Sequence, residues 1–89
     1  MSPEDIADLR HPILRLIKQR EDAGRPGPTV GEVAEGLSTS PAKVWDSVRA
    51  SEGAALLSIH RYQGADYTYF TVFLKPRAHL YLERRAGAD

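Results

Sequence analysis

The stretch that decides the fold is Thr29–Glu52, TVGEVAEGLSTSPAKVWDSVRASE. Thr29 is suited to cap a helix, because Glu32 stands three residues later and can close a capping box onto the free amides of the first turn. Apolar residues then recur at helical spacing, which gives a helix of about two turns one apolar face. The residues of this face are Val30, Val33, Ala34 and Leu37.

A second helix is predicted directly after the first. The apolar pattern stops at residues 38–39, and Ser40 can cap a new helix. Pro41 fits the first helical position, where no amide donor is needed. Val44 and Val48 then form an apolar stripe at i, i+4 spacing. Two short capped helices joined by about three residues are typical of a helix-turn-helix, here over residues 29–52.

The residues before this motif also predict helix. Residues 2–5 supply a cap, a first-turn proline and two acids, which the helix dipole favours at this end. Pro12 interrupts the apolar series, so residues 1–23 are expected to form either two helices, broken between Arg10 and Pro12, or one kinked helix. The loop at 24–28 reads as a linker. The apolar series consists of Ile6, Leu9, Ile13, Leu16 and Ile17.

Two β-branched and aromatic runs around the turn Gln63–Asp66 predict a β-hairpin over residues 55–74. Successive side chains of a strand point to opposite faces, so each face of the second strand carries every other residue. Because both faces are largely apolar or aromatic, we expect the second face to be covered. The second strand face holds Tyr67, Tyr69, Thr71 and Phe73.

A last helix is predicted over residues 76–85. Its apolar content is Ala78, Leu80, Tyr81 and Leu82.

Length and composition limit the function classes. The 89 residues are expected to form one domain, 1–89, with 42% hydrophobic and 27% charged residues, as in ordinary globular proteins. No apolar run approaches the roughly 18 residues of a membrane span, and the start of the chain has no signal-peptide core. The absence of cysteine excludes disulfides and thiolate zinc sites and fits a cytoplasmic protein. Twelve basic and twelve acidic residues cancel, so DNA binding would depend on charge placement.

The stretch from Thr29 to Leu57 resembles the winged helix-turn-helix core of small bacterial and archaeal transcription regulators. The resemblance implies an α+β fold with a three-helix core, a two-stranded wing and a C-terminal helix. Ser38 and Ala55 stand where such proteins commonly have glycine, and Ser51 where they have leucine. The matching residues are Thr29, Glu32, Val33, Ala34, Leu37, Ser40, Pro41, Val44 and Val48, followed by Leu56 and Leu57 at the start of the wing.

The same resemblance implies that helix 41–52 enters the major groove of DNA and that the wing lies near phosphates or the minor groove. Two alternatives stay open for Trp45. It either fills the core space beside Ser51 or forms an exposed anchor for DNA or a protein. The expected DNA-binding residues are Ser40, Ala42, Lys43, Trp45, Asp46, Ser47 and Arg49 in the helix region and His60 and Arg61 in the wing.

Other chemistry is not expected. The three histidines lack the spacing of a metal site, and Ser58 with His60 lacks the strand-turn-helix elbow of a nucleophile. The sequence therefore predicts no enzyme, no cofactor and no small-molecule effector. We expect a DNA-binding regulator acting as a homodimer, because the last helix and the second strand carry more apolar surface than a small domain easily hides. The alternative is a winged-helix module that binds proteins and not DNA.

Overall fold

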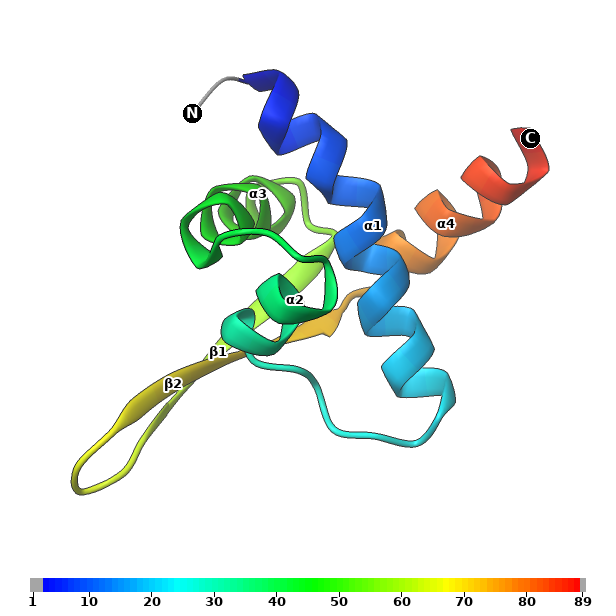
Figure 1. Cartoon of the computed structure of the whole chain (residues 1–89). Helices are drawn as coiled ribbons and strands as arrows, with labels where there is room; N and C mark the ends of the chain where they lie inside the picture. The colour runs from blue at the N-terminus through cyan, green and yellow to red at the C-terminus, as the bar shows by residue number, and fades with distance from the viewer. Residues whose placement is uncertain (1–2, 89) are drawn as a thin grey trace.

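The computed structural model describes the backbone of residues 3–88 and the side chains of residues 9–85. It has the predicted α+β winged-helix architecture, with three helices, a two-stranded hairpin and a fourth helix (Figure 1). In chain order the elements are α1 (Pro3–Asp22), α2 (Val30–Gly36), α3 (Pro41–Gly53), β1 (Leu57–Gln63), β2 (Thr68–Leu74) and α4 (Pro76–Ala88).

Both predicted helix caps are confirmed. The Thr29 hydroxyl accepts a hydrogen bond from the Glu32 amide at 3.1 Å, and the Glu32 carboxylate accepts one from the Thr29 amide at 3.1 Å. This reciprocal pair is a complete capping box. At the start of α3 the Ser40 hydroxyl accepts from the Lys43 amide at 3.3 Å, with Pro41 in the first turn. Each cap satisfies an amide that has no partner within its helix.

α1 is one continuous helix, so of the two alternatives left by Pro12 the broken helix is wrong. Pro12 removes one amide donor, but burial of the residues that follow it holds the helix together. Ile13, Leu14 and Ile17 are all fully buried. Ile6, which belongs to the same apolar series, lies outside the described side chains.

The hydrophobic core lies where α1, α2 and α3 meet the base of the hairpin. On α3 the buried face includes Ser47 and Ser51 beside the two valines. α1 packs against α3, and the small Ser47 and Ser51 side chains add little bulk to the buried face of α3. The fully buried apolar side chains around them are Ile13, Leu14, Ile17, Val33, Val44, Val48, Leu57 and Val72.

The hairpin is covered at its base and open at its tip. The strands pair antiparallel from Leu57 opposite Leu74 to Gln63 opposite Thr68. Residues 27–29 run along β2, where the Val72 amide donates to the Pro28 carbonyl at 3.0 Å. This segment covers the second face near Phe73, as expected. The expectation is wrong at the tip, where Tyr62, Tyr67 and Tyr69 are exposed.

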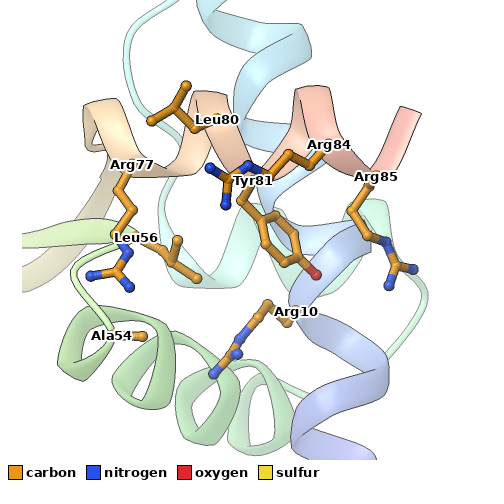
Figure 2. Close-up of a pocket in the computed structure, with 8 residues that line it drawn as sticks. All are labelled: Arg10, Ala54, Leu56, Arg77, Leu80, Tyr81, Arg84 and Arg85. Atoms are coloured by element: carbon orange, nitrogen blue, oxygen red, sulfur yellow. The ribbon is translucent and has the colours of Figure 1, made fainter. Parts of the chain in front are cut away.

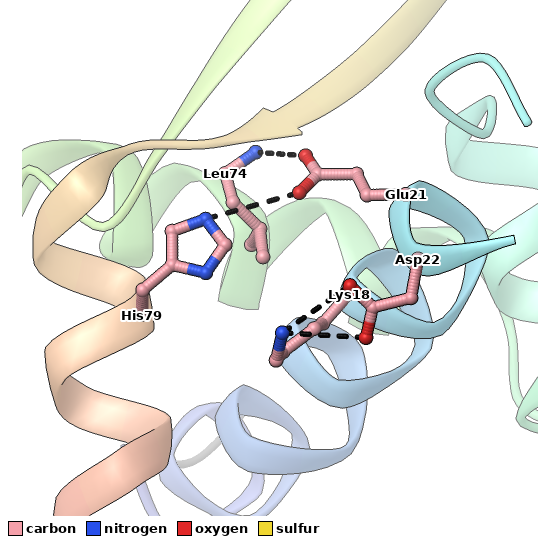
Figure 3. Close-up of polar contacts among 5 residues, drawn as sticks. All are labelled: Lys18, Glu21, Asp22, Leu74 and His79. Atoms are coloured by element: carbon pink, nitrogen blue, oxygen red, sulfur yellow. Dashed lines mark hydrogen bonds and ion pairs between the residues drawn. The ribbon is translucent and has the colours of Figure 1, made fainter. Parts of the chain in front are cut away.

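α4 lies against α1 and the end of β2, on the other side of α1 from α3 in the view of Figure 1. Ala78 and Leu82 face the core, whereas Leu80 is 54% exposed. Glu21 joins these three elements: its carboxylate accepts from the Leu74 amide at 3.2 Å and lies 3.9 Å from the His79 imidazole (Figure 3). One turn away on α1, Lys18 pairs with Asp22 at 3.3 Å, a solvent-exposed contact on the same helix (Figure 3).

Three helices end in the same backbone motif. After α1, α2 and α3, the next two amides bond back across the last turn, as in a Schellman motif. The motif places one residue in the left-handed region, where glycine is favoured. After α1 this residue is Gly24 (φ 73°), but after α2 it is Ser38 (φ 53°) and after α3 it is Ala55 (φ 62°). Ser38 and Ala55 are therefore strained, because they adopt this conformation with a side chain.

Candidate nucleic-acid interface

The exposed face of α3 carries most of the residues predicted to contact DNA. Ala42, Lys43, Asp46 and Arg49 are all exposed, and Ser40 is exposed at the N-terminus of the helix. The Ser40 hydroxyl already accepts the capping bond from the Lys43 amide. This surface therefore offers two cations, one carboxylate and one methyl group to a partner.

Ser47 does not belong to this face, and the prediction that it faces a DNA groove is wrong. Its side chain is fully buried. Together with Val44, Val48 and Ser51 it occupies the i, i+3, i+4, i+7 positions of the buried stripe. That spacing is visible in the sequence, but serine is a residue type that sequence reasoning assigns to surfaces.

Trp45 joins α3 to the wing. Its ring meets Phe70 of β2 edge to face, with centroids 5.0 Å apart and an interplanar angle of 81°. The Arg49 guanidinium carbon lies 5.3 Å from the centroid of the Trp45 ring, in a cation–π arrangement. Trp45 is half-buried, so it combines both alternatives: it packs on the edge of the core and keeps a surface next to Arg49.

The strand register separates His60 from Arg61. Arg61 stands opposite Phe70, and paired residues share one face of a hairpin. Arg61 is therefore on the face that meets Trp45, and Arg49 and Arg61 flank one aromatic contact. The Arg61 guanidinium also donates to the Gln63 side chain at 3.3 Å.

His60 lies on the opposite face of the hairpin, where its ring packs edge to face on Phe73 at 4.8 Å. Its Nε2 is 3.4 Å from the Ser58 hydroxyl. The structure thus brings Lys43, Trp45, Asp46 and Arg49 together on α3. It places Arg61 on the wing face that carries Phe70, the partner of Trp45, and leaves His60 on the other face.

Sequence reasoning did not identify a second feature of the wing, an exposed stack of three tyrosines. Tyr69 is stacked between Tyr62, at a centroid distance of 5.2 Å, and Tyr67, at 5.7 Å. The interplanar angles are 10° and 18°. The signal was present in the sequence, since three tyrosines surround one short turn, but we interpreted them as apolar content and not as a surface.

The part of the chain that the structure describes offers neither a metal site nor a membrane-spanning helix. It contains no cluster of three or more histidine, aspartate or glutamate side chains able to hold a metal ion. Within residues 3–88, no helix combines the length and the apolar character needed to cross a membrane.

Comparison of the sequence with protein-family models and with curated proteins gives no match. Solved structures share the fold. AF1382 from Archaeoglobus fulgidus superposes with a TM-score of 0.72 at 14% identity, over 99% of this chain and 87% of that one. A glycine-to-lysine mutant of S. aureus MepR, a winged-helix regulator, gives 0.67 at 18% identity over 99% of this chain.

MepR has also been solved in complex with DNA, and that structure gives a TM-score of 0.61 at 21% identity over 93% of this chain. The present chain spans 58% and 54% of the two MepR chains. At these identities the similarity establishes the winged-helix fold.

Proposed function

We propose that this protein is a sequence-specific DNA-binding protein, a small transcriptional regulator that places α3 in the major groove. The observation that carries the proposal is the exposed face of α3 beside a long wing, in a fold that MepR uses in a complex with DNA. Lys43 and Arg49 on α3 and Arg61 on the wing supply the cations of this surface. A cytoplasmic location follows from this role, since bacterial and archaeal chromosomes lie there.

Because the net charge is zero, binding through a diffuse positive field is not available. Affinity should therefore depend on these few side chains. As a phosphate contact, Arg61 should contribute to binding of all sequences alike, and Arg61→Ala should lower the salt dependence by about one unit per lost contact. Lys43 faces base edges in this proposal, so Lys43→Ala should change the preference between sequences.

The test is a gel-shift titration of pooled genomic fragments at several salt concentrations, with the parent protein, Lys43→Ala, Arg49→Ala and Arg61→Ala. Arg25→Ala is the charge-matched control, because Arg25 is exposed in the loop between α1 and α2. That loop lies away from α3 (Figure 1). The three variants should bind more weakly than the control. Equal binding by all four variants would contradict the assignment of the α3 surface.

We further propose a homodimer that uses α4. Leu80 on this helix is 54% exposed, and Leu9 of α1 and Tyr81 of α4 are only half-buried. A two-fold dimer would set two α3 helices about one DNA turn apart. Light scattering at micromolar concentration should return about twice the 9.9 kDa of the chain, and Leu80→Lys should return the monomer. A parent protein of monomer mass would refute this part of the proposal.

A protein-binding module is the second candidate, favoured by the exposed tyrosine stack and by Asp46 on the α3 surface. Tyrosine is enriched at protein interfaces, and a carboxylate beside Lys43 repels phosphate. Failure of the parent protein to shift any fragment at low salt would favour this candidate over DNA binding.

A further inference from the structure

A pocket of about 670 Å³ lies between α1, the α3–β1 junction and α4 (Figure 2). Arg77, Tyr81 and Arg85 extend into it from α4, with Tyr81 between the two arginines, and Arg10 reaches it from α1 (Figure 2). Arg84 and Leu56 also line it. Four of the nine arginines of the chain therefore surround one space.

These arginines have no acidic partner among the described side chains, residues 9–85. No carboxylate lines the pocket, and the described ion pairs involve Lys18, Arg20 and His79 instead. The Arg10 Nε is buried without a hydrogen-bond partner in this part of the chain. A buried guanidinium nitrogen left unpaired is costly, so the Arg10 side chain gains if it turns to donate to an oxyanion in the pocket.

We propose that this pocket binds a small organic polyanion with two or more carboxylate or phosphate groups. The planar guanidinium donates two parallel hydrogen bonds to such groups, which makes arginine the preferred side chain for them. Leu56 and the Tyr81 ring give the pocket an apolar wall for a carbon skeleton. The volume lies in the range of small-molecule sites.

Charge balance supports an anion over a neutral ligand. The C-terminal end of α3 adjoins the pocket and contributes a partial negative charge of about half an elementary charge. Four guanidinium charges exceed it several-fold. Their mutual repulsion is relieved when a polyanion enters, so binding should be strongest for multivalent ions.

The pocket suits a small ion better than a DNA backbone. It adjoins the C-terminal end of α3, whereas the proposed DNA surface centres on the exposed side of α3 and the wing.

The test uses the whole chain without DNA, so its result is independent of the proposed function. Calorimetric titration with pyrophosphate and with citrate, each at fixed ionic strength with sodium chloride as the reference, compares phosphate and carboxylate groups. We expect saturable binding of at least one of them. Arg77→Gln and Arg84→Gln should each weaken it about tenfold, as expected for one lost charge-assisted hydrogen bond.

Arg25→Gln and Arg15→Gln are matched controls that remove the same charge from exposed positions outside the pocket. They should leave the affinity unchanged, and far-UV circular dichroism verifies that every variant is folded. Two results would overturn the proposal. One is that neither ion binds more tightly than chloride, and the other is that the control variants lose as much affinity as the pocket variants.

Discussion

Replacing Ser38 with glycine should stabilise the protein, although it removes a side chain. Ser38 has φ 53° at the end of α2, and this left-handed conformation costs an L-residue about 1–2 kcal/mol. Glycine removes this cost, but it makes the unfolded chain more flexible. The added entropy of the unfolded state offsets about 0.4–1 kcal/mol of the stabilisation. Because Ser38 is exposed, no packing is lost. The expected gain is about 0.8 kcal/mol, or a Tm higher by about 3–6 °C for a domain of this size.

Ala55→Gly should give a smaller gain, because Ala55 has the same strained geometry (φ 62°) but is half-buried. Loss of its partly buried methyl group offsets about another 0.4 kcal/mol, which leaves about 0.4 kcal/mol of stabilisation. Gly24→Ala is the reverse control. A Cβ at Gly24 meets no atom within 4 Å, so only the backbone penalty of its φ of 73° acts, and about 0.8 kcal/mol should be lost.

Urea denaturation followed by far-UV circular dichroism measures all three variants. The m-value should stay constant, since the surface exposed on unfolding hardly changes. Destabilisation by Ser38→Gly at constant m, or a neutral Gly24→Ala, would refute the strain assigned to these helix ends.

The same denaturation assay tests five further variants at four positions. Glu21→Ala should lower the free energy of unfolding by about 1–2 kcal/mol, because the part-buried Leu74 amide loses its acceptor. Glu21→Gln should lower it less, and equal losses would show that the hydrogen bond contributes nothing. Thr29→Ala and Ser40→Ala should each cost about 1 kcal/mol, and two neutral results would contradict the capping geometry. Gly27→Ala should cost about 1–3 kcal/mol, because a Cβ there would lie 2.7 Å from both the Phe73 ring and the Val72 carbonyl oxygen; an unchanged midpoint would show that this loop moves away freely.

The sequence predicted the elements whose signals are local. The caps at Thr29 and Ser40 each depend on residues within one helical turn, and the hairpin depends on alternation around one turn. At Pro12 the tendency of proline to break a helix is outweighed by tertiary packing. The sequence left open a helix broken there, but burial of the next turn against the core keeps α1 continuous.

The candidate sites were harder to predict, because they depend on contacts between distant segments. Ser47 was misassigned because a small polar residue can be fully buried, and only the tertiary packing around α3 reveals this. Lys43 and Arg49 are exposed as predicted, because their places follow from the phase of α3. The arginine pocket joins Arg10 to residues of α4 at the other end of the chain, and no local pattern connects them.

Trp45 is the only tryptophan of the chain, and it lies where α3 meets the wing. Its indole is half-buried between the Phe70 ring and the Arg49 guanidinium, with one part open to water. Indole emission depends on local polarity and on nearby charges. A partner that moves Arg49 or expels water from this junction therefore changes the intrinsic fluorescence, and the unlabelled protein carries its own optical reporter of events at α3.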